Sequence, residues 1–187
     1  AEAAGHVVLC GFGRVGRAVG EALETFGVRF VVVERDPDIV HGLRSRDVPC
    51  LFGDAAQSHI LAEAGVARAT LVVVALPEID RAHQVVRGVR SVSPRVPILA
   101  RAHGAPAREA LTHAGATEVI EPELEAAATL IRHALRQLVL PQERVLGYLT
   151  LFRGAMSPAG TAAEAARSAA GALPEVREVG IGAGALA

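Results

Sequence analysis

Short apolar runs alternate with segments of helical periodicity up to about residue 120. The runs are apolar at consecutive positions, which is typical of strands that are buried on both faces of a sheet. Strands that alternate with helices in this way form a parallel sheet with helices on both faces. The pattern therefore predicts an α/β fold with a doubly wound parallel sheet. The expected strands are residues 7–10, 30–33, 49–52, 71–74, 98–100 and 118–120.

The helical segments carry start and stop signals. The first segment has the clearest apolar stripe, and Gly27 is expected to end it. Asp36 is expected to cap the second helix, because Pro37 follows it at the first helical position. Asp54 and Gln57 have the spacing of a capping box, which predicts that Asp54 caps the third helix. The stripe of the first helix comprises Val15, Ala18, Val19, Ala22, Leu23 and Phe26.

Two helices of a different kind are expected after the sixth strand. The first is predicted over 122–140, where Pro141 would end it, and the second lies within 141–153. Together they carry more apolar positions than one sheet edge can cover. Such helices either fold back on their own sheet or pair with a second copy of the chain. We expect the second arrangement, a homodimer formed through the helices after residue 121.

The composition changes once more near the end of the chain. Residues 154–172 are rich in Ala, Gly and Ser, which is typical of a linker. Residues 173–187 contain one more strand-like run and are interpreted as the truncated start of a further domain. The predicted organisation is thus a first domain over 1–140, with its strands between 6 and 120, then a dimerisation helix over 141–153, and then these two segments.

The opening stretch "HVVLCGFGRVGRAVGEALETFGVRFVVVERD" contains the signature of a dinucleotide site. Gly11 would permit a tight turn, Gly13 would let the backbone approach a pyrophosphate, and Gly16 would let the helix pack closely on the strand. The phosphates would meet free N–H groups at a helix N-terminus. Glu34, eighteen residues after Gly16, would accept hydrogen bonds from ribose hydroxyls. This context predicts a Rossmann-like sheet with strand order 3-2-1-4-5-6.

Further residues near the carboxyl ends of the strands complete the candidate cofactor site. Arg14 could clamp a phosphate and Arg101 could meet a phosphate or an anionic effector, although both could equally be exposed surface charges. A carboxylate at Glu34 disfavours NADP, and Arg35 beside it weakens that inference. Asp54 could approach the ribose or the adenine, but a capping role would already account for it. The predicted cofactor-binding residues are Gly11, Phe12, Gly13, Arg14, Val15, Gly16, Glu34, Arg35, Gly53, Asp54, Ala55, Ala75, Leu76 and Arg101.

Composition and charge exclude several classes of function. The chain has 187 residues, is 51% hydrophobic and only 3% aromatic, so its core must consist of aliphatic side chains. The formal net charge of −1 argues against nucleic acid or an anionic membrane as a partner. The longest apolar run, residues 71–76, is far shorter than the roughly 20 residues of a membrane span. All 19 basic residues are arginines, which excludes lysine-dependent catalysis.

A dehydrogenase needs a proton donor or acceptor beside the nicotinamide. His83 and His103 come nearest to the strand ends, but neither has an obvious orienting carboxylate in the sequence. The segment after the sheet is also too short for a substrate domain. We therefore expect a binding module without catalytic residues rather than an enzyme. The alternative is a small NAD-dependent oxidoreductase.

The cysteines and histidines suggest neither a disulfide nor a metal centre. Cys10 and Cys50 fall in the expected first and third strands, which would lie roughly 9–10 Å apart. That separation exceeds the roughly 7 Å limit between the Cα atoms of a disulfide. Both cysteines are expected to be reduced, and no Cys/His spacing indicates a bound metal.

A longer set of motifs resembles the nucleotide-binding RCK domain, also called TrkA-N or KTN, over roughly residues 6–150. Within that family the chain is most similar to the cytosolic regulatory domains of Kef-type potassium/proton antiporters. The motifs that carry the resemblance are the glycine stretch, "FVVVERDPD", "GDAAQSHILAEAGVARATLVVVALP", "VPILARAHG" and "ALTHAGATEVIEPELEAA".

The resemblance implies a cytosolic ligand-sensing regulatory domain of a K+ transporter or cation/proton antiporter. Its ligand would be NAD(H) or an adenine nucleotide, AMP, ADP or ATP, and ligand binding would gate transport through the conformation of a homodimer. The resemblance also implies a cytoplasmic location at the inner face of the cell membrane, and a membrane ion-transport domain in the same full-length chain. Residues 173–187 would begin an RCK C-terminal domain.

Overall fold

The computed structural model describes residues 5–138 and 140–155. They belong to two compact units, divided between residues 127 and 128. The first unit contains the predicted sheet, and the second contains most of α6 (Pro122–Gln137) and all of α7 (Gln142–Ala155). The predicted linker lies outside the described residues except for its first two, which belong to α7. The predicted further domain over 173–187 lies wholly outside them.

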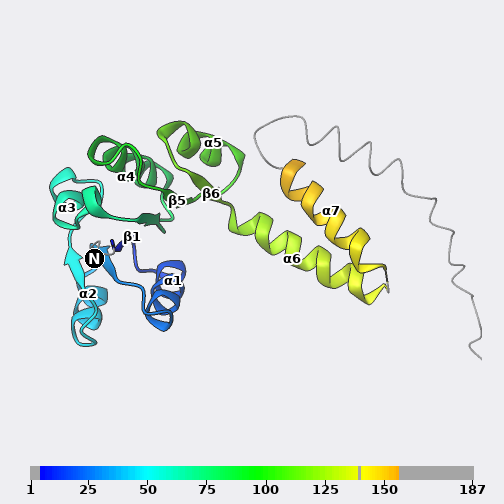
Figure 1. The fold of residues 1–187 in the computed structure, drawn as a ribbon, viewed down its shortest axis with the longest axis horizontal. Coiled ribbons are helices and arrows are strands. Elements are labelled where there is room, and N and C mark those ends of the chain that lie inside the picture. Colours follow the sequence, from blue (N-terminus) through cyan, green and yellow to red (C-terminus); the bar gives the residue numbers. More distant parts are fainter. Residues whose placement is uncertain (1–4, 139, 156–187) are drawn as a thin grey trace, which may run out of the picture. The chain divides into compact units, whose positions relative to one another are not determined.

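The first unit is built on six parallel strands in the order β3-β2-β1-β4-β5-β6, which confirms the predicted fold class and strand order. Figure 1 shows α1 and α2 on one side of these strands and α4 and α5 on the other. The register pairs Cys10 with Val33 and with Val74, so that β1 ends level with β4 and one residue before the end of β2. Glu34 at the end of β2 pairs with Phe52. The strands are β1 (Val7–Cys10), β2 (Phe30–Glu34), β3 (Cys50–Phe52), β4 (Leu71–Val74), β5 (Ile98–Arg101) and β6 (Glu118–Ile120).

Local signals explain most of the helix boundaries. Asp36 caps α2 as predicted, because its Oδ1 accepts a hydrogen bond from the N–H of Asp38 at 2.9 Å. Gly27 follows α1 in a left-handed conformation with a φ of 65°. The prediction that Asp54 caps α3 is wrong, because α3 begins after Gln57 and no side chain caps it. The helices of the first unit are α1 (Arg14–Thr25), α2 (Pro37–Arg44), α3 (Ser58–Glu63), the short 3₁₀ helix η1 (Val66–Arg68), α4 (Ile79–Val92) and α5 (Ala105–Ala114).

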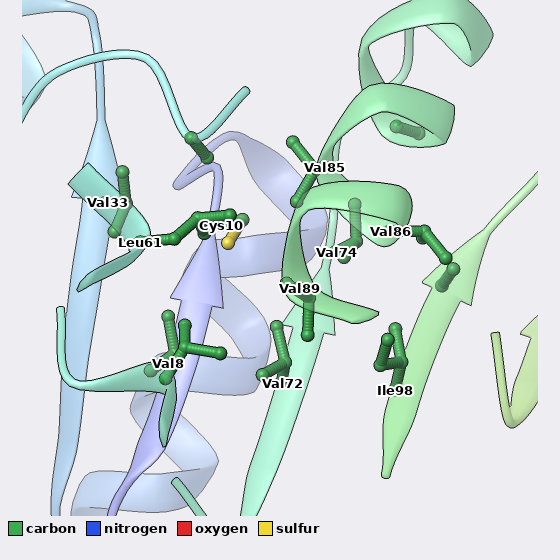
Figure 2. Packing of buried hydrophobic residues seen from close by; sticks show 14 of the residues in the cluster. Val8, Cys10, Val33, Leu61, Val72, Val74, Val85, Val86, Val89 and Ile98 are labelled. Atoms are coloured by element: carbon green, nitrogen blue, oxygen red, sulfur yellow. The ribbon is translucent and has the colours of Figure 1, made fainter. Parts of the chain in front are cut away.

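The two faces of the sheet bury separate aliphatic cores, because successive strand residues point to opposite faces. On one face the side chains of β1, β4 and β5 pack against α3, α4 and α5, and Figure 2 shows the centre of this cluster. On the other face, the strand residues that point away from this cluster, such as Val7, Leu9 and Val32, pack against α1 and α2. Side chains labelled in Figure 2 are Val8, Cys10, Val33, Leu61, Val72, Val74, Val85, Val86, Val89 and Ile98.

Helix α1 contacts the sheet through its glycines and not through the centre of its apolar stripe. Gly16 and Gly20 are its buried residues, and a Cβ on Gly20 would come within 2.7 Å of the Phe12 ring. This close packing needs glycine, so the helix turns its small residues toward the strands. Of the predicted stripe, Val19 and Leu23 are half-buried, while Val15, Ala18, Ala22 and Phe26 are exposed.

In the second unit α6 and α7 pack against each other. Ala128, Val145 and Leu149 form the buried centre of this contact. The rings of Tyr148 and Phe152, which both belong to α7, stack on each other at a centroid distance of 6.5 Å. The pair nevertheless leaves large apolar side chains exposed. These side chains are Leu130, Leu138, Leu140, Leu146 and Tyr148.

Candidate functional site

A crevice of about 1100 Å³ opens at the carboxyl ends of the strands, where β1 turns into α1 and β2 ends. Its volume is slightly above the roughly 300–1,000 Å³ of typical small-molecule sites. In an open α/β sheet this is where ligands bind. The predicted site residues that line it are Gly11, Gly13, Arg14, Val15, Glu34, Arg35, Gly53, Ala55, Ala75, Leu76 and Arg101, whereas Phe12, Gly16 and Asp54 do not.

The three motif glycines are required for different reasons. Gly11 has a φ of 91°, which only glycine adopts without strain, and a Cβ there would come within 2.8 Å of Leu76. A Cβ on Gly16 would overlap the carbonyl oxygen of Gly11. Gly13, in contrast, has an ordinary φ of −68° and an open position where a Cβ would meet nothing within 4 Å. Close packing and backbone conformation therefore explain two of the glycines, whereas Gly13, which caps α1 and lines the crevice, is required by neither.

The Glu34 carboxylate is held in place at the wall of the crevice by backbone donors. Its Oε2 accepts a hydrogen bond from the N–H of Phe12 at 2.6 Å. Its Oε1 accepts from the N–H groups of Arg35 at 2.7 Å and Asp36 at 3.0 Å. A carboxylate offers about four lone-pair sites, so these three bonds fix its orientation and leave capacity for a ligand hydroxyl. Phe12 thus contributes to the site through its N–H while its ring is buried.

Two ion pairs on the crevice wall were not predicted from the sequence. Arg81 lies in the first turns of α4, and its Nη2 donates to Asp54 Oδ1 at 2.7 Å. Burial would raise the pKa of Asp54, but the N–H of Ala56 and the Arg81 guanidinium outweigh it and hold that pKa below its ordinary value. Arg35 faces Glu78 at 3.7 Å, and both side chains are about half exposed. The sequence did contain a signal for these ion pairs. An acid and an arginine, Glu78 and Arg81, stand at the start of the helix after β4, and that helix borders the crevice at the switch point.

At the other edge of the crevice, Arg101 is bonded to a histidine that has a carboxylate partner. Arg101 Nη2 lies 2.8 Å from His103 Nε2, and His103 Nδ1 lies 2.6 Å from Glu123 Oε1. The expectation that His103 lacks an orienting carboxylate is therefore wrong, since the partner is 20 residues further along the chain. His103 itself does not line the crevice.

The remaining chemical candidates have structural explanations or lie outside the crevice. His83 is half-buried on α4 and does not line the crevice. Cys10 and Cys50 are free, and complete burial raises the pKa of the Cys10 thiol to about 12. Across residues 5–138 and 140–155, no three His, Cys, Asp or Glu side chains gather in a way that could hold a metal ion. None of the described helices combines the length and the apolar character needed to cross a membrane.

The strand order, the glycine turn and the acid after β2 define a Rossmann-type α/β domain with a crevice at its switch point. Residues 7–122 match the family model of the TrkA-N domain. The chain therefore belongs to the TrkA-N domain family.

The relatives that match this chain are named as potassium-efflux proteins. The putative K(+) efflux antiporter KefB of Alkalimonas amylolytica is 34% identical over 140 residues, which cover 75% of this chain and 21% of that protein. The glutathione-regulated potassium-efflux system protein KefC of Cronobacter sakazakii is 32% identical over 148 residues, which cover 79% of this chain and 24% of that protein. The chain thus spans less than a quarter of the length of these relatives.

Solved structures share the fold over most of the described residues. The TrkA-N domain of the inner membrane protein ybaL from Escherichia coli matches with a TM-score of 0.66 at 32% identity, covering 70% of this chain and 96% of that one. The Shewanella denitrificans Kef CTD in its AMP-bound form matches with a TM-score of 0.70 at 25% identity, covering 88% and 98%. The GsuK channel bound to NAD matches with a TM-score of 0.60 at 26% identity, covering 71% and 23%.

Proposed function

We propose that this chain is a ligand-sensing regulatory domain of a monovalent cation transporter or cation/proton antiporter, and that it binds NAD(H) or an adenine nucleotide in the crevice. The observation that carries the proposal is Gly13. Its backbone conformation would suit any residue and its Cβ position is open, so packing does not require glycine there, and the missing side chain leaves room for a group that approaches from the crevice. A phosphate at the N-terminus of α1 is such a group.

The charges of the crevice suggest how a nucleotide would lie. Glu34 offers a fixed acceptor to ribose hydroxyls at the end of β2. Arg35 and Arg81 each have an acidic partner, so neither leaves an unpaired positive charge on the adenosine side of the crevice. Arg14 opens α1 beside Gly13, lines the crevice, and has no carboxylate partner among the described residues. We therefore assign the phosphates to the part of the crevice beside Arg14, where the helix N-terminus also favours an anion, with Arg101 on the crevice wall as a second cation for them.

Regulation would follow from a difference in affinity rather than from chemistry on the ligand. A nucleotide that binds one arrangement of a homodimer more tightly than another shifts the dimer toward that arrangement. A coupling of roughly 1–3 kcal/mol would change the active fraction of an attached transporter about 5–150-fold. The exposed leucines of α6 and α7 are the surface that we assign to the dimer. The attached transport domain would place this chain at the cytoplasmic face of the membrane.

A thermal-shift series with NAD, NADH, AMP, ADP and ATP tests the proposal. A ligand present at about 100 times its Kd adds about 2.7 kcal/mol to the free energy of unfolding, which is readily detected as a rise in Tm. Light scattering measured in parallel reports whether the chain is a dimer. A monomer whose Tm responds to none of the five nucleotides would refute the proposal. Turnover of NAD against a panel of substrates would instead favour a small oxidoreductase.

A further inference from the structure

Three side chains connect the crevice to the beginning of α6. Arg101 is the last residue of β5 and lines the crevice. Its Nη2 lies 2.8 Å from His103 Nε2, and His103 Nδ1 lies 2.6 Å from Oε1 of Glu123, which is in the first turn of α6. The histidine side chain is 43% exposed, so it exchanges protons with solvent directly.

The partners determine which nitrogen of His103 carries the proton. A guanidinium has only donors, so Nε2 must accept the hydrogen bond from Arg101. Nδ1 then carries the proton and donates it to Glu123, whose oxygen can only accept. The N–H of Glu123 itself and then His103 hold the pKa of the Glu123 carboxyl below its ordinary value, so it stays ionised at neutral pH. The arrangement therefore requires a neutral imidazole.

Arg101 depends on this histidine for its position. Its Nε is buried and has no hydrogen-bond partner among the described residues, so the bond from Nη2 to His103 orients the guanidinium. The other charged pair at this edge is Arg108 on α5, which is 15% exposed, and the buried Glu121 after β6, and the two lie 3.0 Å apart. Those two charges offset each other, and histidine is the side-chain type that most readily gains a proton in the physiological range.

We propose that His103 is a positioning residue that makes nucleotide binding sensitive to pH by holding Arg101 at the crevice only while the imidazole is neutral. Protonation places a hydrogen on Nε2 and a positive charge beside the guanidinium. The bond to Arg101 is then lost and the two cations repel each other, while Glu123 keeps the imidazolium in place. Arg101 leaves the orientation in which it meets a ligand phosphate. The inference rests on the proposed nucleotide site and adds a proton as a second input to it.

The test compares affinities at pH 8 and pH 5.5 by calorimetry, with NAD and AMP as probes. NAD is informative because the charge of its pyrophosphate does not change in this range. For the wild type we expect affinity to fall about tenfold toward pH 5.5, since a hydrogen bond to a charged group is worth at least that factor. His103→Gln keeps an acceptor oxygen that does not titrate, so its affinity should not depend on pH. His113→Gln, on the exposed surface of α5, is the matched control and should retain the wild-type slope.

The outcomes separate this inference from the function on which it rests. If neither probe binds at pH 8 and none of NADH, ADP and ATP binds in their place, the nucleotide site itself is refuted. If a probe binds but the wild type and His103→Gln show the same dependence on pH, or affinity rises toward pH 5.5, only the role of His103 is overturned. The ¹⁵N shifts of the histidine ring give a readout without any ligand. They should show a proton on Nδ1 at pH 8, and a proton on Nε2 would contradict the arrangement.

Discussion

The variant Gly13→Ala tests whether glycine at this position serves the fold or the binding of a ligand. Gly13 is the N-cap of α1, with φ of −68° and ψ of −163°, and an added methyl would meet no atom within 4 Å. Alanine restricts the backbone of the unfolded chain more than glycine does, which stabilises the variant by about 0.4–1 kcal/mol. Alanine is a poorer N-cap than glycine, which costs about 0.5–1 kcal/mol. The two terms offset each other, so the free energy of unfolding should change by less than about 1 kcal/mol.

Nucleotide binding should respond very differently. The methyl would project where we place the phosphates, and it would push a phosphate away from the N–H groups at the start of α1. Each lost hydrogen bond to a charged group costs roughly 1.5–3 kcal/mol, so affinity should fall about tenfold or more. Calorimetry measures the affinity, and urea denaturation of the ligand-free protein measures the stability.

Gly16→Ala is the contrasting variant. Its Cβ would overlap the Gly11 carbonyl oxygen, so α1 would have to move away from β1, at a cost of about 1–3 kcal/mol in stability. The reasoning is refuted if Gly13→Ala binds nucleotide as tightly as the wild type. It is also refuted if Gly13→Ala is destabilised as much as Gly16→Ala, because the glycine would then serve the fold.

Further predictions concern charged and buried groups. Glu34→Ala should weaken nucleotide binding and, because three backbone N–H groups lose their acceptor, should also lower the midpoint of urea denaturation. Glu121→Ala removes the carboxylate that faces Arg108 at 3.0 Å and should cost about 3 kcal/mol by the same assay, the lower end of the range for a buried pair, because Arg108 keeps some contact with solvent. Cys10, whose pKa burial raises to about 12, should resist alkylation until the chain unfolds, as mass spectrometry would detect. Because folding lowers the pKa of Asp54, its ionised carboxylate stabilises the fold above about pH 4, and this stabilisation is lost as the pH falls further. Asp54→Asn should therefore flatten the fall in stability between pH 5 and 3.

Three of these predictions have outcomes that would contradict the physical reason given for them. An unchanged denaturation midpoint for Glu34→Ala would mean that the backbone donors find other acceptors. Rapid native alkylation of Cys10 would mean that the centre of the sheet opens readily. An Asp54→Asn protein as acid-sensitive as the wild type would show that the salt bridge to Arg81 contributes little.

The amino-acid sequence by itself determined the parallel sheet, its strand order and the location of the crevice. These depend on local properties, namely consecutive apolar runs, a cap such as Asp36 and a glycine that needs a positive φ, such as Gly11. Each of those signals lies within a few residues of the element that it specifies. The position of Glu34 followed in the same way, since an acid that ends the second strand must lie beside the glycine turn.

Only the tertiary structure decided which polar groups are partners. Asp54 was expected to cap a helix, but it bonds to Arg81, 27 residues later. His103 was expected to lack a carboxylate, but Glu123 lies against it across 20 residues. In α1, close packing on the strands favoured the glycine face over the centre of the apolar stripe. Pairing and packing of this kind depend on how separate elements meet in space, and no short stretch of sequence contains that information.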